Sequence, residues 1–159
     1  MSELDRKFMT RAIELAQAGV EQNLGGPFGC VIVKDGGIVG EGNNQVTSTN
    51  DPTAHAEIVA IREACRKLGS FQLEGCVVYT SCEPCPMCLG AIYWARAERI
   101  YIACNRTDAA GAGFDDAFIY EELCGEDFAN RRVPISTMMR DEGLEVFKNW
   151  VEKPDKVPY

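Results

Sequence analysis

One histidine and two cysteines in this chain have the types and the spacing of zinc ligands. His55, the only histidine, lies in TAHAEI, and Cys85 and Cys88 lie downstream in TSCEPCPMCLG. Zinc is bound in proteins by imidazole nitrogens and thiolates, and a catalytic zinc ion keeps one of its four positions open for water. The chain offers three such ligands and no obvious fourth. The spacing therefore predicts a catalytic zinc site rather than a closed structural one.

Glu57 lies two residues after His55, where its carboxylate can take part in chemistry without binding the metal. The pattern H-x-E followed by P-C-x-x-C is the signature of zinc deaminases that act on nucleobases, in which the glutamate is the general acid and base. A lone C-x-x-C is also typical of a redox pair. The histidine and glutamate at the start of an apolar helical run favour the zinc interpretation.

Length and composition indicate one domain over residues 1–159. The chain has 46% hydrophobic and 25% charged residues, which is ordinary for a globular protein, and no apolar run reaches the roughly 18 residues that span a bilayer. The start, MSELDRKFMT, lacks the apolar core of a signal peptide. A formal net charge of −8 disfavours a nucleic-acid partner, because such proteins neutralise phosphates with clustered Lys and Arg. We expect a cytoplasmic protein with a small uncharged substrate and no membrane contact.

The chain contains eight cysteines, and in a reducing compartment these favour metal binding and buried thiols over disulfides. Cys82 forms a second, overlapping C-x-x-C with Cys85, but it precedes the expected helix start and is the weaker candidate ligand. The other five fall in or beside apolar segments, and we expect them to be core or near-core thiols: Cys30, Cys65, Cys76, Cys104 and Cys124.

Apolar periodicity and turn residues predict five helices and five strands. The expected helices cover residues 4–18, 53–68, 84–95, 114–123 and 141–151, and the expected strands cover residues 28–34, 38–43, 73–80, 99–104 and 133–138. Asp35-Gly36-Gly37 joins the first two strands as an antiparallel hairpin, and strand–helix–strand units make the later strands parallel. The expected fold class is α/β, a three-layer α/β/α sandwich with a five-stranded mixed sheet. Gly19 is the expected stop of the first helix, and residues 108–113 form an expected loop.

Two helix starts must bring the candidate ligands together. His55 and Glu57 fall in the first turn of the helix over 53–68, which Asp51 or Thr53 is expected to cap. The cysteines of PCPMC open the next helix, where they share one face and where the helix amino end favours the thiolate. Both segments can therefore present their ligands to one ion.

TAHAEI, SCEPCPMC and the flanking GGPFG resemble the cytidine deaminase superfamily, in its branch of nucleobase and tRNA deaminases, over essentially the whole chain. Within that branch PFGCVIVKDG, NDPTAHAE, TSCEPCPMCLGAIYWAR, TDAAGAGFDDAFIYEE and the terminal tyrosine look most like bacterial guanine deaminases. The resemblance implies a cytidine deaminase-like fold, one zinc ion per subunit, and hydrolysis of guanine to xanthine and ammonia. Zinc would lower the pKa of a bound water to about 7, and Glu57 would take and return its proton.

The same resemblance assigns residues to the substrate. Asn44 would hydrogen-bond the purine edge, Phe28 would pack against the ring, and Ala56 belongs to the same substrate-binding set. Asp116 would lie near the leaving amine. Tyr159, in the tail 152–159, would close the pocket of the neighbouring subunit, which implies a homodimer with exchanged C-terminal segments. Simpler roles remain open, because Asn44 can cap a loop, Asp116 can cap a helix and Tyr159 can be a frayed end.

Other functions fit the same zinc signature. A deaminase of a related ring is the first alternative, acting on guanosine, cytosine or an aminotriazine such as ammelide. A tRNA adenosine deaminase is the second, although the basic face expected of it is not evident in this acidic composition. A non-enzymatic zinc module is the third. Such a module would tolerate Glu57→Gln, whereas an enzyme would keep its zinc and lose turnover.

Overall fold

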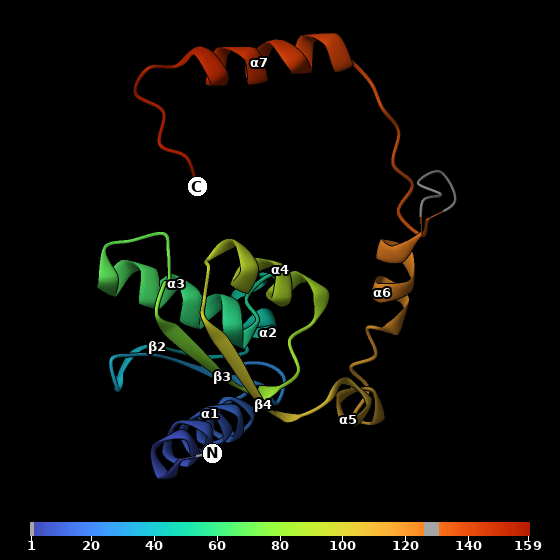
Figure 1. The fold of residues 1–159 in the computed structure, drawn as a ribbon. Helices are drawn as coiled ribbons and strands as arrows, with labels where there is room; N and C mark the ends of the chain where they lie inside the picture. Colours follow the sequence, from blue (N-terminus) through green and yellow to red (C-terminus); the bar gives the residue numbers. More distant parts are fainter. Residues whose placement is uncertain (1, 126–130) are drawn as a thin grey trace. The chain divides into compact units, whose positions relative to one another are not determined.

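Four strands and seven helices make up the part of the chain that the structure, a computed structural model, describes: residues 2–125 and 131–159. They fall into two units, residues 1–116 and residues 117–159. The first unit contains α1 (Glu3–Glu21), β1 (Gly29–Lys34), β2 (Gly37–Asn43), α2 (Val46–Thr49), α3 (Ala56–Leu68), β3 (Cys76–Cys82), α4 (Pro86–Trp94), β4 (Arg99–Cys104) and α5 (Arg106–Gly111). The second contains α6 (Ala117–Cys124) and α7 (Arg140–Glu152), as labelled in Figure 1.

The sheet has the strand order β2-β1-β3-β4. β1 runs antiparallel to β2 and to β3, and β3 runs parallel to β4, so the predicted mixed sheet is confirmed. Asp35 (φ 51°) and Gly36 (φ 75°) form the turn between β1 and β2. Positive φ at both central residues matches the right-handed twist of a hairpin, and the predicted hairpin is present.

The predicted fifth strand is wrong. Residues 133–138 have no strand conformation, and the described part of the chain has a sheet of four strands. Val133 and Ile135 suggested the alternation of a strand, but Pro134 between them has no N–H to give to a ladder. Both apolar side chains are exposed. Alternation of this kind favours a strand only where a neighbouring strand supplies the hydrogen bonds.

Helices cover both faces of the sheet, with α1 on one side and α3 and α4 on the other (Figure 1). Side chains of β1 alternate between the faces because a strand has a period of two residues. Val31 and Val33 pack in the cluster that contains Phe8 of α1, and Cys30 and Ile32 pack in the cluster of α3. The first unit thus has helices, sheet and helices in layers.

Two glycines of β2 let α3 lie close against the sheet. A Cβ atom at Gly42 would lie 2.7 Å from the main-chain nitrogen of Ala60, and one at Gly40 would lie 2.9 Å from the Cβ of Ala64. Contacts this short force a neighbour to move, so these positions need a residue without a Cβ. The glycines therefore fix where α3 sits on the sheet.

α1 continues through Gly19, which was the predicted stop. A Cβ atom at Gly19 would lie 2.7 Å from Nδ2 of Asn43, so the glycine permits contact with β2 and does not end the helix. At its other end, Ser2 and Asp5 form a capping box. The hydroxyl of Tyr79 in β3 donates to Oδ1 of Asp5 at 2.7 Å, which attaches the start of α1 to the sheet.

Residues 108–113, predicted as a loop, lie mostly in α5. Asn105 caps this helix through a capping box with Asp108.

All eight cysteines are free thiols. Cys104 and Cys124, which were expected to be core or near-core thiols, are exposed. No helix in the two described stretches is long and apolar enough to cross a membrane.

The second unit consists of two helices and the segments that follow each of them. Its apolar side chains are largely exposed within the described chain; on α7 these are Val146, Phe147, Trp150 and Val151. The predicted helices over 114–123 and 141–151 are present as α6 and α7, displaced by one to three residues at their ends.

Candidate active site

The three candidate ligands lie at the starts of two helices. His55 is the N-cap of α3, with φ −68° and ψ 156°, and Cys85 is the N-cap of α4, with φ −64° and ψ 168°. Cys88 follows in the first turn of α4, after Pro86 at its first position, where proline costs no hydrogen bond. Neither N-cap side chain makes a capping hydrogen bond, so both are available to a metal.

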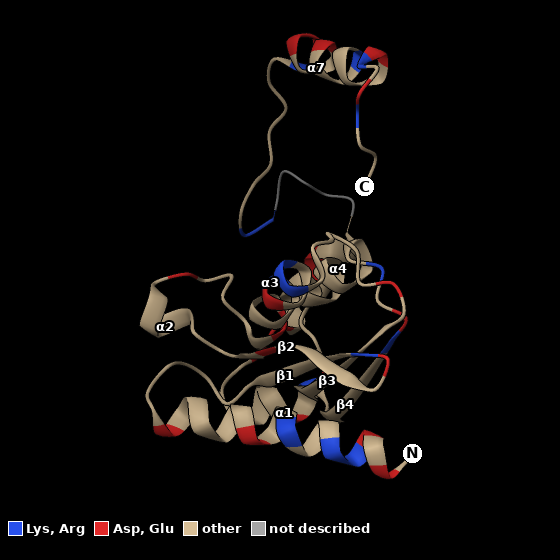
Figure 2. Cartoon of the chain, turned by 90° about the vertical axis from the view of Figure 1, so that its left-hand side faces the viewer, with Lys and Arg blue, Asp and Glu red and all other residues tan. Residues whose placement is uncertain are grey.

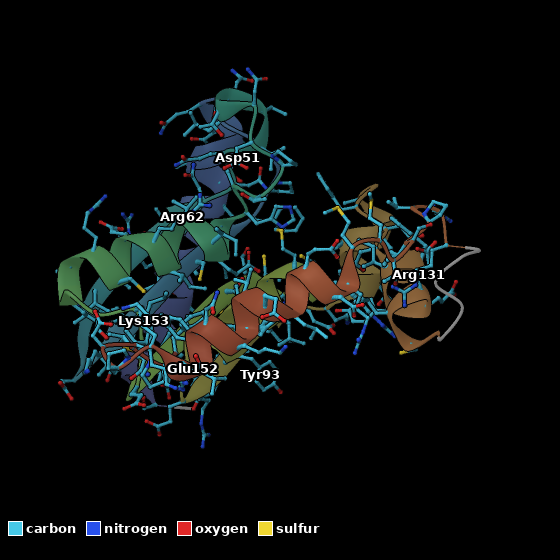
Figure 3. The ribbon with its side chains drawn as sticks, turned by 90° about the horizontal axis from the view of Figure 1, so that it is seen from above. Asp51, Arg62, Tyr93, Arg131, Glu152 and Lys153 are labelled. Atoms are coloured by element: carbon cyan, nitrogen blue, oxygen red, sulfur yellow. The ribbon has the colours of Figure 1, made fainter. Side chains whose placement is uncertain are left out.

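α3 begins later than predicted, and His55 takes the N-cap position that Asp51 or Thr53 was expected to fill. Asp51 instead accepts hydrogen bonds from the main-chain nitrogen and the hydroxyl of Thr53, at 2.8 and 2.7 Å. Its other carboxylate oxygen lies 3.6 Å from Nη1 of Arg62 on α3 (Figure 3). These interactions hold the turn that leads into His55.

The donor atoms have the spacing of a zinc site. Nδ1 of His55 lies 3.5 Å from Sγ of Cys85 and 3.5 Å from Sγ of Cys88, and the three donor atoms lie within 4.8 Å of one another. With Zn–N of about 2.1 Å and Zn–S of about 2.3 Å, a tetrahedral ion separates its nitrogen and sulfur ligands by about 3.6 Å. The distances and the donor set therefore fit zinc with one position left open.

Interactions within this donor cluster favour the thiolate at Cys85 and the protonated forms of His55 and Cys88. The hydrogen bond from Cys88 lowers the pKa of Cys85 to about 4, so Cys85 is a thiolate at neutral pH. The hydrogen bond with Cys85 raises the pKa of His55, and together with burial it raises the pKa of Cys88 well above its usual value. Metal binding would therefore release the protons that His55 and Cys88 hold.

Glu57 lies in the first turn of α3 and is only 6% exposed. Burial raises the pKa of its carboxyl group, because a low-dielectric surrounding disfavours the charged form. Its Oε1 accepts a hydrogen bond from the hydroxyl of Thr80 at 3.4 Å. A buried carboxyl group beside three metal-donor atoms is placed to exchange protons with a water at the open position of the metal.

A cavity of about 360 Å³ opens beside the donor cluster, and His55, Glu57 and Cys85 line it. Phe28 and Phe114 form an apolar wall in which the rings meet edge to face, with centroids 4.9 Å apart and planes at 85°. A concave site with apolar walls and a few convergent polar groups is typical of small-molecule binding.

Asn44 directly follows β2, is 6% exposed and lines the same cavity. Its Oδ1 accepts hydrogen bonds from the main-chain nitrogens of Gly26 and Val46, at 3.1 and 3.2 Å. Asn44 can therefore cap the loop through its oxygen and still contact the substrate, so the two roles expected from sequence do not exclude each other. Because the oxygen is occupied, the group that remains for a ligand is the Nδ2 amide, which can only donate.

The structure brings some predicted substrate-binding residues to the cavity and not others. Phe28 and Asp116 line it, and burial together with the charge of Cys85 raises the pKa of Asp116. Ala56 is fully buried at the first residue of α3 and is not among the lining residues. Tyr159 belongs to the second unit and is 71% exposed, so its place at a pocket stays a prediction.

Several residues of the site did not stand out from the sequence. Phe114 and Arg106 line the cavity, and the glycine-rich GAGFDD segment was the one signal that pointed to Phe114. Thr80 is one of two adjacent buried hydroxyl residues, Thr80 and Ser81, at the end of β3. Cys82 is not one of the donor atoms, since its sulfur lies 3.5 Å from the carbonyl oxygen of Asn105.

Sequence comparison places this site in a known family. The family model for the cytidine and deoxycytidylate deaminase zinc-binding region matches residues 2–104. The guanine deaminase of Bacillus subtilis (strain 168) is 54% identical over 152 residues, which cover 96% of this chain and 97% of that protein. A tRNA-specific adenosine deaminase of Aquifex aeolicus (strain VF5) is 36% identical over 127 residues, which cover 80% of this chain and 81% of that protein.

Structural comparison agrees. The X-ray structure of guanine deaminase from Bacillus subtilis matches with a TM-score of 0.94 at 52% identity, covering 100% of this chain and 99% of that one. The α/β fold is therefore cytidine deaminase-like, and the predicted resemblance is confirmed. His55, Cys85 and Cys88, which form the donor cluster, all lie within the matched zinc-binding region. The chain belongs to the cytidine and deoxycytidylate deaminase family of zinc-binding enzymes.

Proposed function

We propose that the protein is a guanine deaminase, which hydrolyses guanine to xanthine and ammonia with one zinc ion per subunit. The observation that carries the proposal is the meeting of three groups at one cavity: the zinc-donor cluster, the buried carboxyl group of Glu57 and the amide donor of Asn44. Identity of 54% to the Bacillus subtilis guanine deaminase over nearly the whole chain supports guanine as the ring.

His55, Cys85 and Cys88 would hold the zinc ion, which when bound lowers the pKa of a water at its open position. Glu57 would accept the proton of the attacking water and deliver it to a ring nitrogen of guanine. The water oxygen would add to C2, Glu57 would move the second proton of that water to the exocyclic nitrogen, and the bond between C2 and this nitrogen would break to release ammonia. Asp116, which lines the same cavity, would bind the leaving amine.

Asn44 would select the purine. Both purines present an acceptor at N7, but at the six position guanine presents the acceptor O6 where adenine presents an amine donor. An Asn44 side chain that can only donate matches the guanine edge and opposes the adenine amine with a second donor. Phe28 and Phe114 would contact the face or edge of the ring, which accounts for the apolar wall.

A tRNA substrate is the weaker alternative, although tRNA-specific adenosine deaminases are among the relatives. Proteins that bind a polynucleotide present a continuous basic surface. Here Lys and Arg are interspersed with Asp and Glu along α1 (Figure 2), and the net charge is −8. The cavity itself is lined by the carboxylates of Glu83, Asp115 and Asp116, with Arg106 as a basic neighbour, which also disfavours a phosphate-rich partner.

We also infer that the enzyme is a homodimer in which the tail 152–159 is exchanged between subunits and Tyr159 closes the pocket of the neighbouring subunit. Residues 1–159 would form a single deaminase domain that includes this tail. Exposed apolar side chains support an association: Tyr93 and Trp94 at the end of α4 are 75% and 68% exposed, and α7 exposes Phe147 and Trp150. Large exposed apolar patches mark interaction surfaces. Free cysteines support a reducing location such as the cytoplasm, where guanine breakdown would take place.

Ammonia release tests the proposal. The purified, zinc-loaded protein is given guanine, guanosine, adenine, cytosine and ammelide in parallel, and guanine is expected to be the favoured substrate. Ammonia release from another ring without release from guanine would contradict guanine as the substrate but would still support zinc-dependent deamination.

A pair of variants tests the role of Glu57. Glu57→Gln is expected to keep its zinc and to lose about 10² to 10⁴ in kcat, the usual contribution of a general acid and base. Glu74→Gln removes an exposed carboxylate outside the cavity and is expected to behave like the parent. Near-parental activity of Glu57→Gln would rule out this residue as the proton carrier, whereas a parent protein that deaminates no ring would favour the non-enzymatic zinc module.

A further inference from the structure

Thr80 places a buried hydroxyl in an apolar row of β3. Cys76, Val78 and Thr80 share the α3 side of the sheet because alternate strand residues point the same way, and Cys76 and Val78 belong to the apolar cluster there. Thr80 is 1% exposed. Valine has nearly the same shape and would fill the same space, so the hydroxyl is what distinguishes threonine here.

The partner of that hydroxyl is Glu57. Oγ1 of Thr80 donates to Oε1 of Glu57 at 3.4 Å, and this bond joins β3 to the first turn of α3. Burying a hydroxyl without a partner costs free energy, which makes the contact more than incidental. The bond is long, as hydrogen bonds of catalytic groups often are before substrate binds; they shorten in the reacting complex.

We propose that Thr80 is a positioning residue that holds the Glu57 carboxyl group in the orientation needed for proton transfer. The inference rests on the proposed function, in which Glu57 carries the proton. Thr80 does not line the cavity, whereas Glu57 does, so Thr80 reaches the substrate only through Glu57. Glutamate has a long, flexible side chain, and a hydrogen bond to one oxygen limits the rotation of the carboxyl group between accepting a proton and returning it.

Thr80→Val and Thr80→Ser separate the hydroxyl from the shape of the side chain. With guanine, Thr80→Val is expected to lower kcat about tenfold and to change KM by less than about twofold. Thr80→Ser returns a hydroxyl to the same carbon and is expected to recover kcat to within about threefold of the parent. Both variants should keep the parental zinc content, because Thr80 is not a metal donor.

Ser81→Ala is the matched control. It also removes one buried hydroxyl from β3, but Ser81 Oγ accepts a hydrogen bond from the main-chain nitrogen of Gly29 at 3.0 Å and lies on the α1 side by alternation. This variant is expected to lose stability and to keep its kcat. If Thr80→Val fails to fold, Thr80→Ala compared with Thr80→Ser gives the same contrast.

Parental kcat in Thr80→Val or Thr80→Ala would overturn the inference. The inference would also fail if Ser81→Ala lowered kcat as much as Thr80→Val does, if the Thr80 variants lost zinc, or if Thr80→Ser did not recover kcat. If the parent deaminates another ring instead of guanine, the same variants are compared on that ring, and the proposed substrate fails while Thr80 is still tested. If the parent deaminates no ring, the proposed function fails and the role of Thr80 fails with it.

Discussion

Asn44→Asp separates the two roles of Asn44, which are to hold a loop and to donate to the substrate. In the parent, Oδ1 of Asn44 lies 3.1 and 3.2 Å from the main-chain nitrogens of Gly26 and Val46. A carboxylate oxygen of Asp can accept the same two hydrogen bonds, and its negative charge strengthens them. The Nδ2 donor is replaced by a second oxygen. The loop should therefore stay in place while the donor to the purine is lost.

The expected loss follows from the hydrogen bonds involved. Loss of the hydrogen bond from Nδ2 removes about 1 kcal/mol of transition-state stabilisation. An oxygen that faces an acceptor of the purine in a buried site costs about 1–3 kcal/mol more. The sum of about 2–4 kcal/mol corresponds to roughly a 30- to 1,000-fold drop in kcat/KM for guanine. Asn44→Ala also removes the acceptor and leaves two part-buried N–H groups unpaired, at about 1–3 kcal/mol of folding stability, or roughly 2–12 °C in Tm.

The assay pairs ammonia release with thermal denaturation. Asn44→Asp should lose activity with a Tm close to that of the parent, and Asn44→Ala should lose both. Asn43→Asp adds the same charge at a neighbouring residue that does not line the cavity, and its kcat/KM should stay near the parental value. Near-parental kcat/KM in Asn44→Asp would refute the donor role and leave Asn44 as a loop cap only.

Three further predictions concern the metal, acid stability and the aromatic wall. Chelation should lower Tm and zinc should restore it, since a ligand at 1,000 times its Kd adds about 4.1 kcal/mol; an unchanged Tm after verified zinc loss would contradict the ligand set. The hydrogen bond from Tyr79 lowers the pKa of Asp5 from 3.8 to about 2, so its stabilisation is complete above the unfolded pKa and is lost as pH falls through the folded one. The difference in urea midpoint between the parent and Asp5→Asn should vanish over that range, and a pH-independent difference would speak against the bond. Phe114→Leu removes the edge-to-face contact with Phe28 and should raise KM roughly 2- to 10-fold at similar kcat; steady-state kinetics with an unchanged KM would exclude Phe114 from the binding wall.

The metal donors were predictable from sequence because short-range geometry brings most of them together. Cys85 and Cys88 are one helical turn apart, and His55 lies two residues before Glu57 at the start of another helix. The hairpin at Asp35-Gly36 was predictable for the same reason, since positive φ at two adjacent residues is a local property of the turn.

Features that depend on distant partners were not predictable. Phe114 contacts Phe28 in one wall of the cavity although the two residues are far apart in the sequence, and no local pattern pairs them. The alternation around Pro134 indicated a strand, but a strand forms only beside another strand. α5 begins with an Asn105–x–x–Asp108 capping box, a weaker signal than Ser or Thr followed by Glu, and its Ala- and Gly-rich composition suggested a loop.

The glycines of β2 have a consequence for genetics. A Cβ atom at Gly42 would meet the carbonyl oxygen of Ala56, the residue between His55 and Glu57, so a side chain there displaces the start of α3. Misplacement of a reacting group by about 1 Å can cost 10²-fold in rate. A selection for inactive alleles should therefore recover changes at Gly42 alongside changes at Glu57, although Gly42 does not line the cavity. Metal content would distinguish the two classes of allele, because only a displaced helix start also disturbs the ligand.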